Sequence, residues 1–139
     1  MAEQQKFKVV LPSWMTEDDI DAAADDIIQF IIDRSAEGQG IRGNGRRYRF
    51  PGYTDAYKKK KGSSKVDLVL NDEMLAEIQT LQRDGHELTI GFEAGKQNDK
   101  AEGNQIGSYG RDPNPSKARR FLGINKEELA AVLARFRDD

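Results

Sequence analysis

A single histidine is the residue of this chain that first raises the question of catalysis. His86 stands in Arg83-Asp84-Gly85-His86, a stretch typical of a hairpin turn. General acid–base catalysis needs a titratable group tuned inside a pocket, whereas a turn histidine is usually solvated. No Gly-x-Ser-x-Gly nucleophile motif occurs in the sequence. We therefore predict a protein without enzymatic activity.

A row of aspartates raises the question of metal binding. Asp18, Asp21 and Asp25 recur on neighbouring turns of an expected helix. Metal sites need clustered histidine, cysteine or carboxylate ligands, and this chain has no cysteine. Helical carboxylates without a histidine or a loop cage are more often surface charge. The sequence therefore predicts no metal and no cofactor.

The stretch Glu37–Arg49 (EGQGIRGNGRRYR) has the glycine and arginine content of a phosphate-binding loop. A Walker loop ends in Gly-Lys-Ser/Thr before a helix, and a dinucleotide fingerprint follows a strand; neither context is present. Regular structure is disfavoured by four glycines, Gly38, Gly40, Gly43 and Gly45. We therefore expect a long flexible loop over residues 37–49 that becomes ordered on contact with a partner.

Charge is segregated along the chain, although the formal net charge is only −2. Acidic residues crowd the segment before Arg34, and basic residues dominate the segment after it. Two interpretations remain open: two solvated faces, or an acidic face that meets the basic face of the next subunit and closes a ring. The candidate interface or lumen-facing residues are Asp18, Asp21, Asp25, Arg42, Arg46, Arg47, Arg49, Lys58, Lys59, Lys60 and Lys61.

Nucleic-acid binding is the alternative function. The basic residues between Arg42 and Lys61 interleave with four aromatic residues, Tyr48, Phe50, Tyr53 and Tyr57. Arginine for phosphate and aromatic rings for base stacking are the groups that single-strand binding uses. Against this, the whole chain is slightly acidic, and no known nucleic-acid-binding motif matches.

The elements that must position these residues follow from periodicity and end signals. Alternation predicts strands over Lys6–Leu11, Val66–Leu70 and Leu88–Phe92, and a strand is favoured over Leu75–Gln82 because a turn follows. Thr16 begins a predicted helix over Glu17–Ala36. A short helix is expected near Asp99–Gln105, an extended segment over Arg119–Leu122, and a terminal helix to about Arg137 behind the capping box Asn125–Glu128.

Together these elements predict one domain over residues 1–139 with an α+β fold. A small antiparallel sheet would be packed by an N-terminal and a C-terminal helix. Only 37% of the residues are hydrophobic and 33% are charged, which is little apolar material for a self-sufficient domain. We therefore expect the fold to depend on neighbouring subunits. The sequence shows no signal peptide and no transmembrane run, which indicates synthesis in a cytoplasm.

Five short motifs occur in one order between Phe50 and Phe136. They are FPGY with YK (50–58), VDLVLNDEML (66–75), TIGF (89–92), AEGNQ (101–105) and RFLGI (120–124). In these motifs the chain resembles the tail-completion and virion-morphogenesis proteins that join head and tail in tailed bacteriophages. Two positions depart from the family pattern: Arg120 replaces the usual proline, and Asn104 stands where histidine is common.

The resemblance implies a structural virion protein that forms a ring in the phage neck and joins the tail to the DNA-filled head. It implies a hexamer first and a ring of twelve as the alternative. Its partners would be further copies of itself, the connector or stopper, the tail terminator and the tail tube, with contact to packaged DNA and none to a membrane. The protein would be made in the host bacterial cytoplasm. Structural roles would fall on Tyr53, Tyr57, Asn104, Gln105, Phe121, Leu122 and Gly123.

Overall fold

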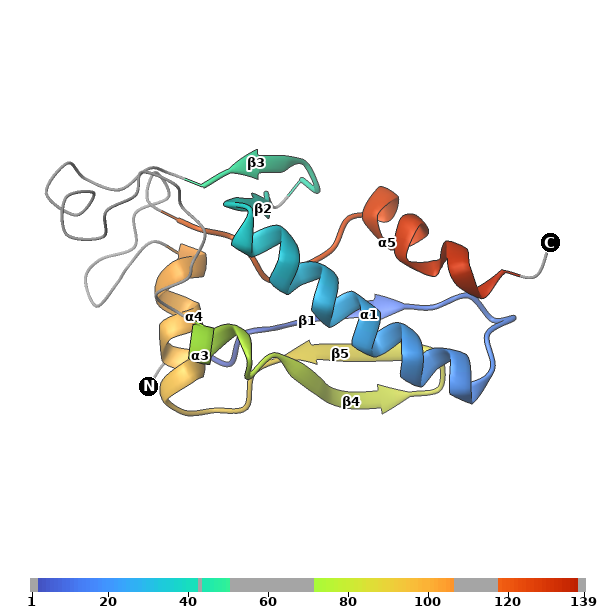
Figure 1. The fold of residues 1–139 in the computed structure, drawn as a ribbon. Helices are drawn as coiled ribbons and strands as arrows, with labels where there is room; N and C mark the ends of the chain where they lie inside the picture. Colours follow the sequence, from blue (N-terminus) through green and yellow to red (C-terminus); the bar gives the residue numbers. More distant parts are fainter. Residues whose placement is uncertain (1–2, 43, 51–71, 107–117, 138–139) are drawn as a thin grey trace, which may run out of the picture.

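The fold of this chain is α+β, as the sequence predicts. A computed structural model describes residues 3–42, 44–50, 72–106 and 118–137. The elements in chain order are β1 (Lys6–Val10), α1 (Glu17–Ala36), β2 (Gln39–Ile41), β3 (Arg47–Arg49), α3 (Asp72–Leu75), β4 (Gln79–Asp84), β5 (Glu87–Gly91), α4 (Lys96–Ile106), α5 (Lys126–Leu133) and the 3-10 turn η3 (Ala134–Phe136). Figure 1 shows α1 crossing the middle of the molecule, with α5 beside it.

A three-stranded antiparallel sheet in the order β1-β5-β4 forms the base of the fold. Val9 pairs with the buried Leu88 and Phe7 pairs with the buried Ile90, so these four side chains share the core face. The predicted turn between β4 and β5 is confirmed. Gly85 occupies it with φ 61°, a left-handed conformation that glycine adopts without steric cost.

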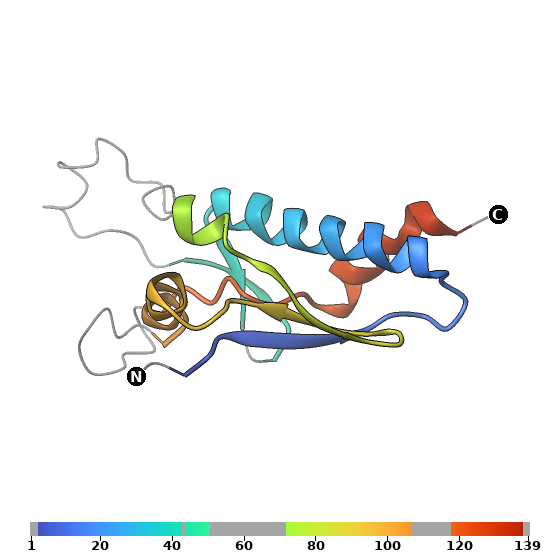
Figure 2. The ribbon, with the colours of Figure 1, turned by 90° about the horizontal axis from the view of Figure 1, so that it is seen from below.

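Helix α1 covers one face of this sheet. Its bounds, Glu17–Ala36, are those predicted, and the Thr16 side chain accepts a hydrogen bond from the Asp19 backbone as a capping box requires. Ile20, Ile27 and Ile31 are buried against the sheet because they recur on one side of the helix. In Figure 2, α1 lies over the sheet, and no helix among the described residues covers the opposite face.

The prediction that Glu37–Arg49 lacks regular structure is wrong. β2 and β3 form an antiparallel hairpin in which Gly40 pairs with Tyr48. Close packing explains the glycine here: a Cβ on Gly40 would lie 2.3 Å from the carbonyl oxygen of Arg120 and 2.3 Å from a ring carbon of Phe50. Glycine therefore permits close packing at this position rather than mobility.

The strand predicted over Leu75–Gln82 is confirmed only from Gln79 onward, and Leu75 belongs to a short helix. α3 ends at Leu75, and β4 begins only at Gln79, because Met74, Leu75 and Ile78 all turn inward and are buried. Helix α4 packs against α3 and is longer than the predicted Asp99–Gln105. The predicted strand Val66–Leu70 lies outside the described residues.

Residues 118–124 lead from this region to α5. Arg119–Leu122 is not a strand, although the Ile41 backbone N–H donates to the carbonyl of Arg120 over 2.8 Å. The capping box is confirmed, since the Asn125 side chain accepts from the Glu128 backbone. Helix α5 ends at Leu133, and the 3-10 turn η3 follows it directly. This turn ends at Phe136, one residue before the predicted end of the helix.

Candidate functional site

Three exposed aspartates, Asp18, Asp21 and Asp25, lie on the solvent side of α1, and we call them the acidic ridge. Asp21 forms an ion pair with Arg83 of β4. Asp18 and Asp25 form no ion pair within the part of the chain that the structure describes. The aspartates therefore form a surface row of negative charge in which, among the described residues, only the middle member has an ion-pair partner.

The β2–β3 hairpin carries four arginines, Arg42, Arg46, Arg47 and Arg49, and we call it the arginine hairpin. All four are exposed. Only Arg47 forms an ion pair with another described residue, while the guanidinium of Arg42 lies 4.6 Å from the ring centroid of Tyr48. The hairpin therefore carries more positive charge than the described residues neutralise through ion pairs.

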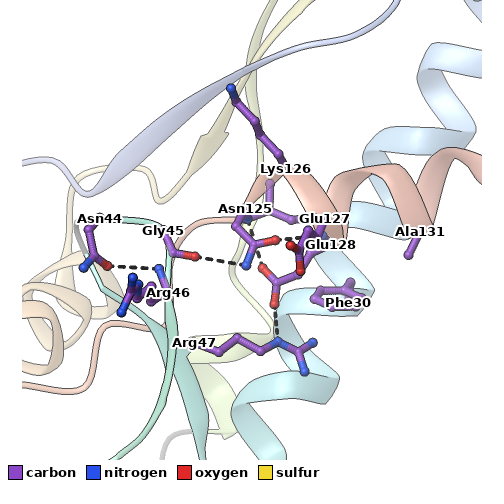
Figure 3. Close-up of a pocket in the computed structure, with 11 residues that line it drawn as sticks. Phe30, Asn44, Gly45, Arg46, Arg47, Asn125, Lys126, Glu127, Glu128 and Ala131 are labelled. Carbon is purple, nitrogen blue, oxygen red and sulfur yellow. Dashed lines mark hydrogen bonds and ion pairs between the residues drawn. The ribbon is translucent and has the colours of Figure 1, made fainter.

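Glu128 holds the arginine hairpin, α1 and α5 together. Its two carboxylate oxygens accept hydrogen bonds from Arg34 over 2.7 Å and from Arg47 over 2.6 Å. Arg34 and Glu128 are buried, with relative exposures of 3% and 5%. The amide of Asn125 also donates to the carbonyl of Gly45 over 3.0 Å, which ties the hairpin to the start of α5 (Figure 3).

Two opposing effects act on the pKa of Glu128. Burial alone would raise it, because desolvation disfavours the charged form. Hydrogen bonds from the Asn125 backbone and from Arg47 and Arg34 outweigh burial, so the pKa of Glu128 lies below its ordinary value of 4.5. Burial also lowers the pKa of Arg34, and the carboxylate of Glu128 opposes that shift.

The depressed pKa of Glu128 predicts acid sensitivity. A carboxyl group whose pKa is lower when folded adds stability above its unfolded pKa, and that stability is lost as pH falls through the folded value. In urea unfolding, the stability difference between wild type and Glu128→Gln should therefore stay constant at neutral pH and shrink as the pH falls below 4.5. Glu127→Gln, which makes the same chemical change at the exposed neighbouring position, is the control. A Glu128→Gln difference that does not change with pH would contradict this assignment.

An open cleft of about 870 Å³ lies between α1, the arginine hairpin and the start of α5. Its apolar lining comes from Phe30, Ile124 and Ala131, and its cationic lining from Arg46, Arg47 and Lys126. Figure 3 shows Arg47 entering from the hairpin below Phe30. We call this feature the Arg47 cleft.

The sequence-predicted site residues are only partly brought together. Arg46 and Arg47 share the Arg47 cleft, whereas the acidic ridge lies along the N-terminal half of α1. Lys58, Lys59, Lys60, Lys61, Tyr53 and Tyr57 lie outside the described residues. Arg34 was missed as a site residue, although its position three residues after Ile31 continues the apolar stripe of α1 and indicates burial.

Three residues that the resemblance marks as structural hold residues 118–122 in place. Asn104 is buried, and its carbonyl accepts a hydrogen bond from the Arg119 backbone over 2.6 Å. The side-chain oxygen of Gln105 accepts one from the Leu122 backbone over 3.1 Å. The ring of Phe121 is fully buried against Phe92. Leu122 is also buried, and Gly123 is half-buried.

His86 is half-buried rather than solvated as expected. Its Nε2 atom lies 3.0 Å from the carbonyl oxygen of Met15, and its own carbonyl accepts from the Leu11 backbone. Both contacts join the β4–β5 turn to the loop before α1. No group of three potential metal ligands occurs in the described ranges. The absence of enzymatic activity stays a prediction.

Two aromatic residues of the proposed nucleic-acid segment are already used by the fold. Phe50 is buried, and the Tyr48 hydroxyl donates to the carbonyl of Ala118 and accepts from the Arg120 backbone. The Tyr48 ring also contacts the guanidinium of Arg42 and, in an edge-on arrangement, the ring of Phe50. Neither ring is therefore a free platform for base stacking.

Comparisons with known protein families, with curated proteins and with solved structures find no match for this chain. Among the helices of the described residues, none combines the length and the apolar character needed to cross a membrane.

Proposed function

We propose that this chain is a structural subunit that assembles with copies of itself into a ring in the neck of a tailed bacteriophage. The ring would complete the tail and join it to the DNA-filled head. The observation that carries the proposal is the presence of two surfaces of opposite charge on one folded chain, the acidic ridge and the arginine hairpin, each only partly neutralised by ion pairs among the described residues.

The two surfaces are separated along α1. The ridge occupies its first turns, and the hairpin follows its C-terminal end. Intramolecular ion pairing neutralises Asp21 and Asp26, through Arg83 and Arg135, but leaves Asp18 and Asp25 without an ion pair in the described part of the chain. Two complementary patches at different places on one subunit favour a head-to-tail contact, which closes into a ring when the rotation permits.

The resemblance adds the particular setting, the phage neck. Its motif residues Phe121, Leu122 and Asn104 are buried in the described fold, which suits the structural roles that the resemblance implies. The partners proposed are further copies of this chain, the connector or stopper, the tail terminator and the tail tube. The proposal requires no cofactor and no catalytic residue.

A reconstitution assay tests this function. Purified protein is mixed with DNA-filled tailless capsids and with loose tails of the phage that encodes it. We expect infectivity to be restored, and virions to contain the chain in a ring at the neck. Heat-unfolded protein serves as the control and should restore nothing.

Failure of the folded protein to join heads and tails would overturn the proposal. The alternative, a nucleic-acid-binding module, predicts a different outcome. The isolated protein would bind single-stranded DNA tightly, the affinity would fall steeply with salt, and Arg46→Ala would abolish binding without an effect on assembly.

A further inference from the structure

The ion cluster around Glu128 contains two guanidinium groups, those of Arg34 and Arg47, and only one carboxylate. Arg34 and Arg47 both bind Glu128, so the three side chains carry one uncompensated positive charge. Arg34 places its Nη donors on Glu128 and on the carbonyls of Phe121 and Gly123. Arg47 uses only its Nε donor in the contact with Glu128, and its Nη donors have no acceptor among the described residues.

Arg47 is also held in position. Its Nε donates to Glu128 over 2.6 Å, and its guanidinium carbon lies 5.6 Å from the ring centroid of Phe30. The side chain is nevertheless about half exposed, at 46%. A guanidinium with its Nη groups free offers a planar fork that matches a carboxylate in a bidentate contact. Because the side chain is already ordered, binding would cost it little further entropy.

The surroundings of Arg47 favour an anionic ligand. Arg46 and Lys126 add two positive charges to the lining of the Arg47 cleft, and Glu127 adds one negative charge. Glu128 is already occupied by the two arginines. The cleft is therefore net positive, and it is open to solvent.

We propose that the Arg47 cleft receives an aspartate carboxylate from the acidic ridge of a second copy of this chain. Asp18 and Asp25 match this role, since both are exposed and neither has an ion-pair partner in the ranges that the structure covers. They are seven residues apart, so they lie on one side of α1 about 10 Å from each other along its axis. One aspartate can reach Arg47 while the other meets Arg46 or Lys126.

Within one chain, neither Asp18 nor Asp25 pairs with Arg47 among the described residues. Asp18 and Asp25 lie sixteen and nine positions before Arg34 on α1, which correspond to rises of about 24 Å and about 14 Å along the helix axis. Each copy therefore offers its ridge to one neighbour and its cleft to another. This inference rests on the proposed function only in that it takes copies of the chain as partners.

A charge-swap experiment tests the contact. Self-association is measured by sedimentation velocity at low salt for wild type, for Asp18→Lys/Asp25→Lys and for Arg46→Glu/Lys126→Glu. We expect wild type to associate, and each double variant alone to associate at least about tenfold more weakly because like charges then face each other. Mixing the two double variants should restore association, since every ridge then meets a cleft of opposite charge.

A matched pair of conservative variants tests the guanidinium of Arg47 itself. Arg47→Lys keeps the charge but loses the fork, and it should weaken association about tenfold. Arg49→Lys, on the same strand but outside the cleft, should associate like wild type. Circular dichroism verifies that each variant is folded.

Several results would overturn the inference. They are a wild-type chain that remains monomeric, a mixture of the two double variants that fails to associate, or ridge variants that associate like wild type. The virion assay gives an independent answer. Restored association without head–tail joining would refute the neck function and keep the contact, whereas joining with ridge variants that behave like wild type would refute the contact alone.

Discussion

Replacing Glu128 by glutamine is expected to lower the free energy of unfolding by about 3–5 kcal/mol. The substitution keeps the shape of the side chain and removes its charge. Arg34 then remains buried, at 3% relative exposure, without a counter-charge. Removal of one partner from a buried ion pair is costly mainly because the remaining charge stays desolvated.

Urea unfolding at neutral pH measures this effect. Glu127→Gln is the matched control, because it makes the same chemical change one residue earlier on α5 at an exposed position. It should alter stability by no more than about 0.5 kcal/mol. A loss below about 1 kcal/mol for Glu128→Gln would show that Arg34 is solvated in the folded protein. The Arg34–Glu128 pair would then contribute little to the stability of the fold.

Much of the local structure could be predicted because it depends on neighbours in the sequence. The N-cap at Thr16 and the capping box at Asn125 both depend on residues a few positions apart, and both are confirmed. The alternation in β1 and β5 and the turn at Gly85 likewise need only adjacent residues. Such signals indicate where an element begins and which face it buries.

The arginine hairpin could not be predicted, because its stability comes from residues distant in the chain. Phe50 is buried in the core, and the Ile41 backbone donates to the carbonyl of Arg120, nearly eighty positions later. Local propensity favoured an irregular loop, since glycine disfavours strands. Tertiary packing reversed that preference at Gly40, where a larger residue would not fit.

Only the two charged surfaces of the candidate site could be predicted from the sequence. Segregated charge along the sequence indicated the acidic ridge and the arginine hairpin, and both are exposed surfaces in the fold. The pairing of Arg34 with Glu128 joins residues 94 positions apart, and neither periodicity nor a motif identifies such a partner. A basic residue in the last turn of a helix is also favoured by the helix dipole. The presence of Arg34 in the last turn of α1 therefore does not require its side chain to be buried.

Phe121→Ala is the second substitution with a large expected effect, a loss of about 3–5 kcal/mol. The ring is fully buried and packs edge-on against Phe92, with ring centroids 6.0 Å apart. Truncation removes this contact and leaves a cavity that the surrounding side chains fill only in part. Val10→Ala is the control, since Val10 is 67% exposed and should change stability by no more than about 0.5 kcal/mol.

The backbone of Phe121 couples this packing to the Glu128 cluster. Its carbonyl accepts a hydrogen bond from Arg34 over 2.6 Å, so movement of residue 121 into the cavity would shift an acceptor of the buried guanidinium. Stability losses of Phe121→Ala and Glu128→Gln should therefore differ from additivity by about 0.5–3 kcal/mol in a double-mutant cycle. Val10→Ala combined with Glu128→Gln should be additive. Additive losses for the first pair would mean that the packing of Phe121 and the ion cluster stabilise the fold independently of each other.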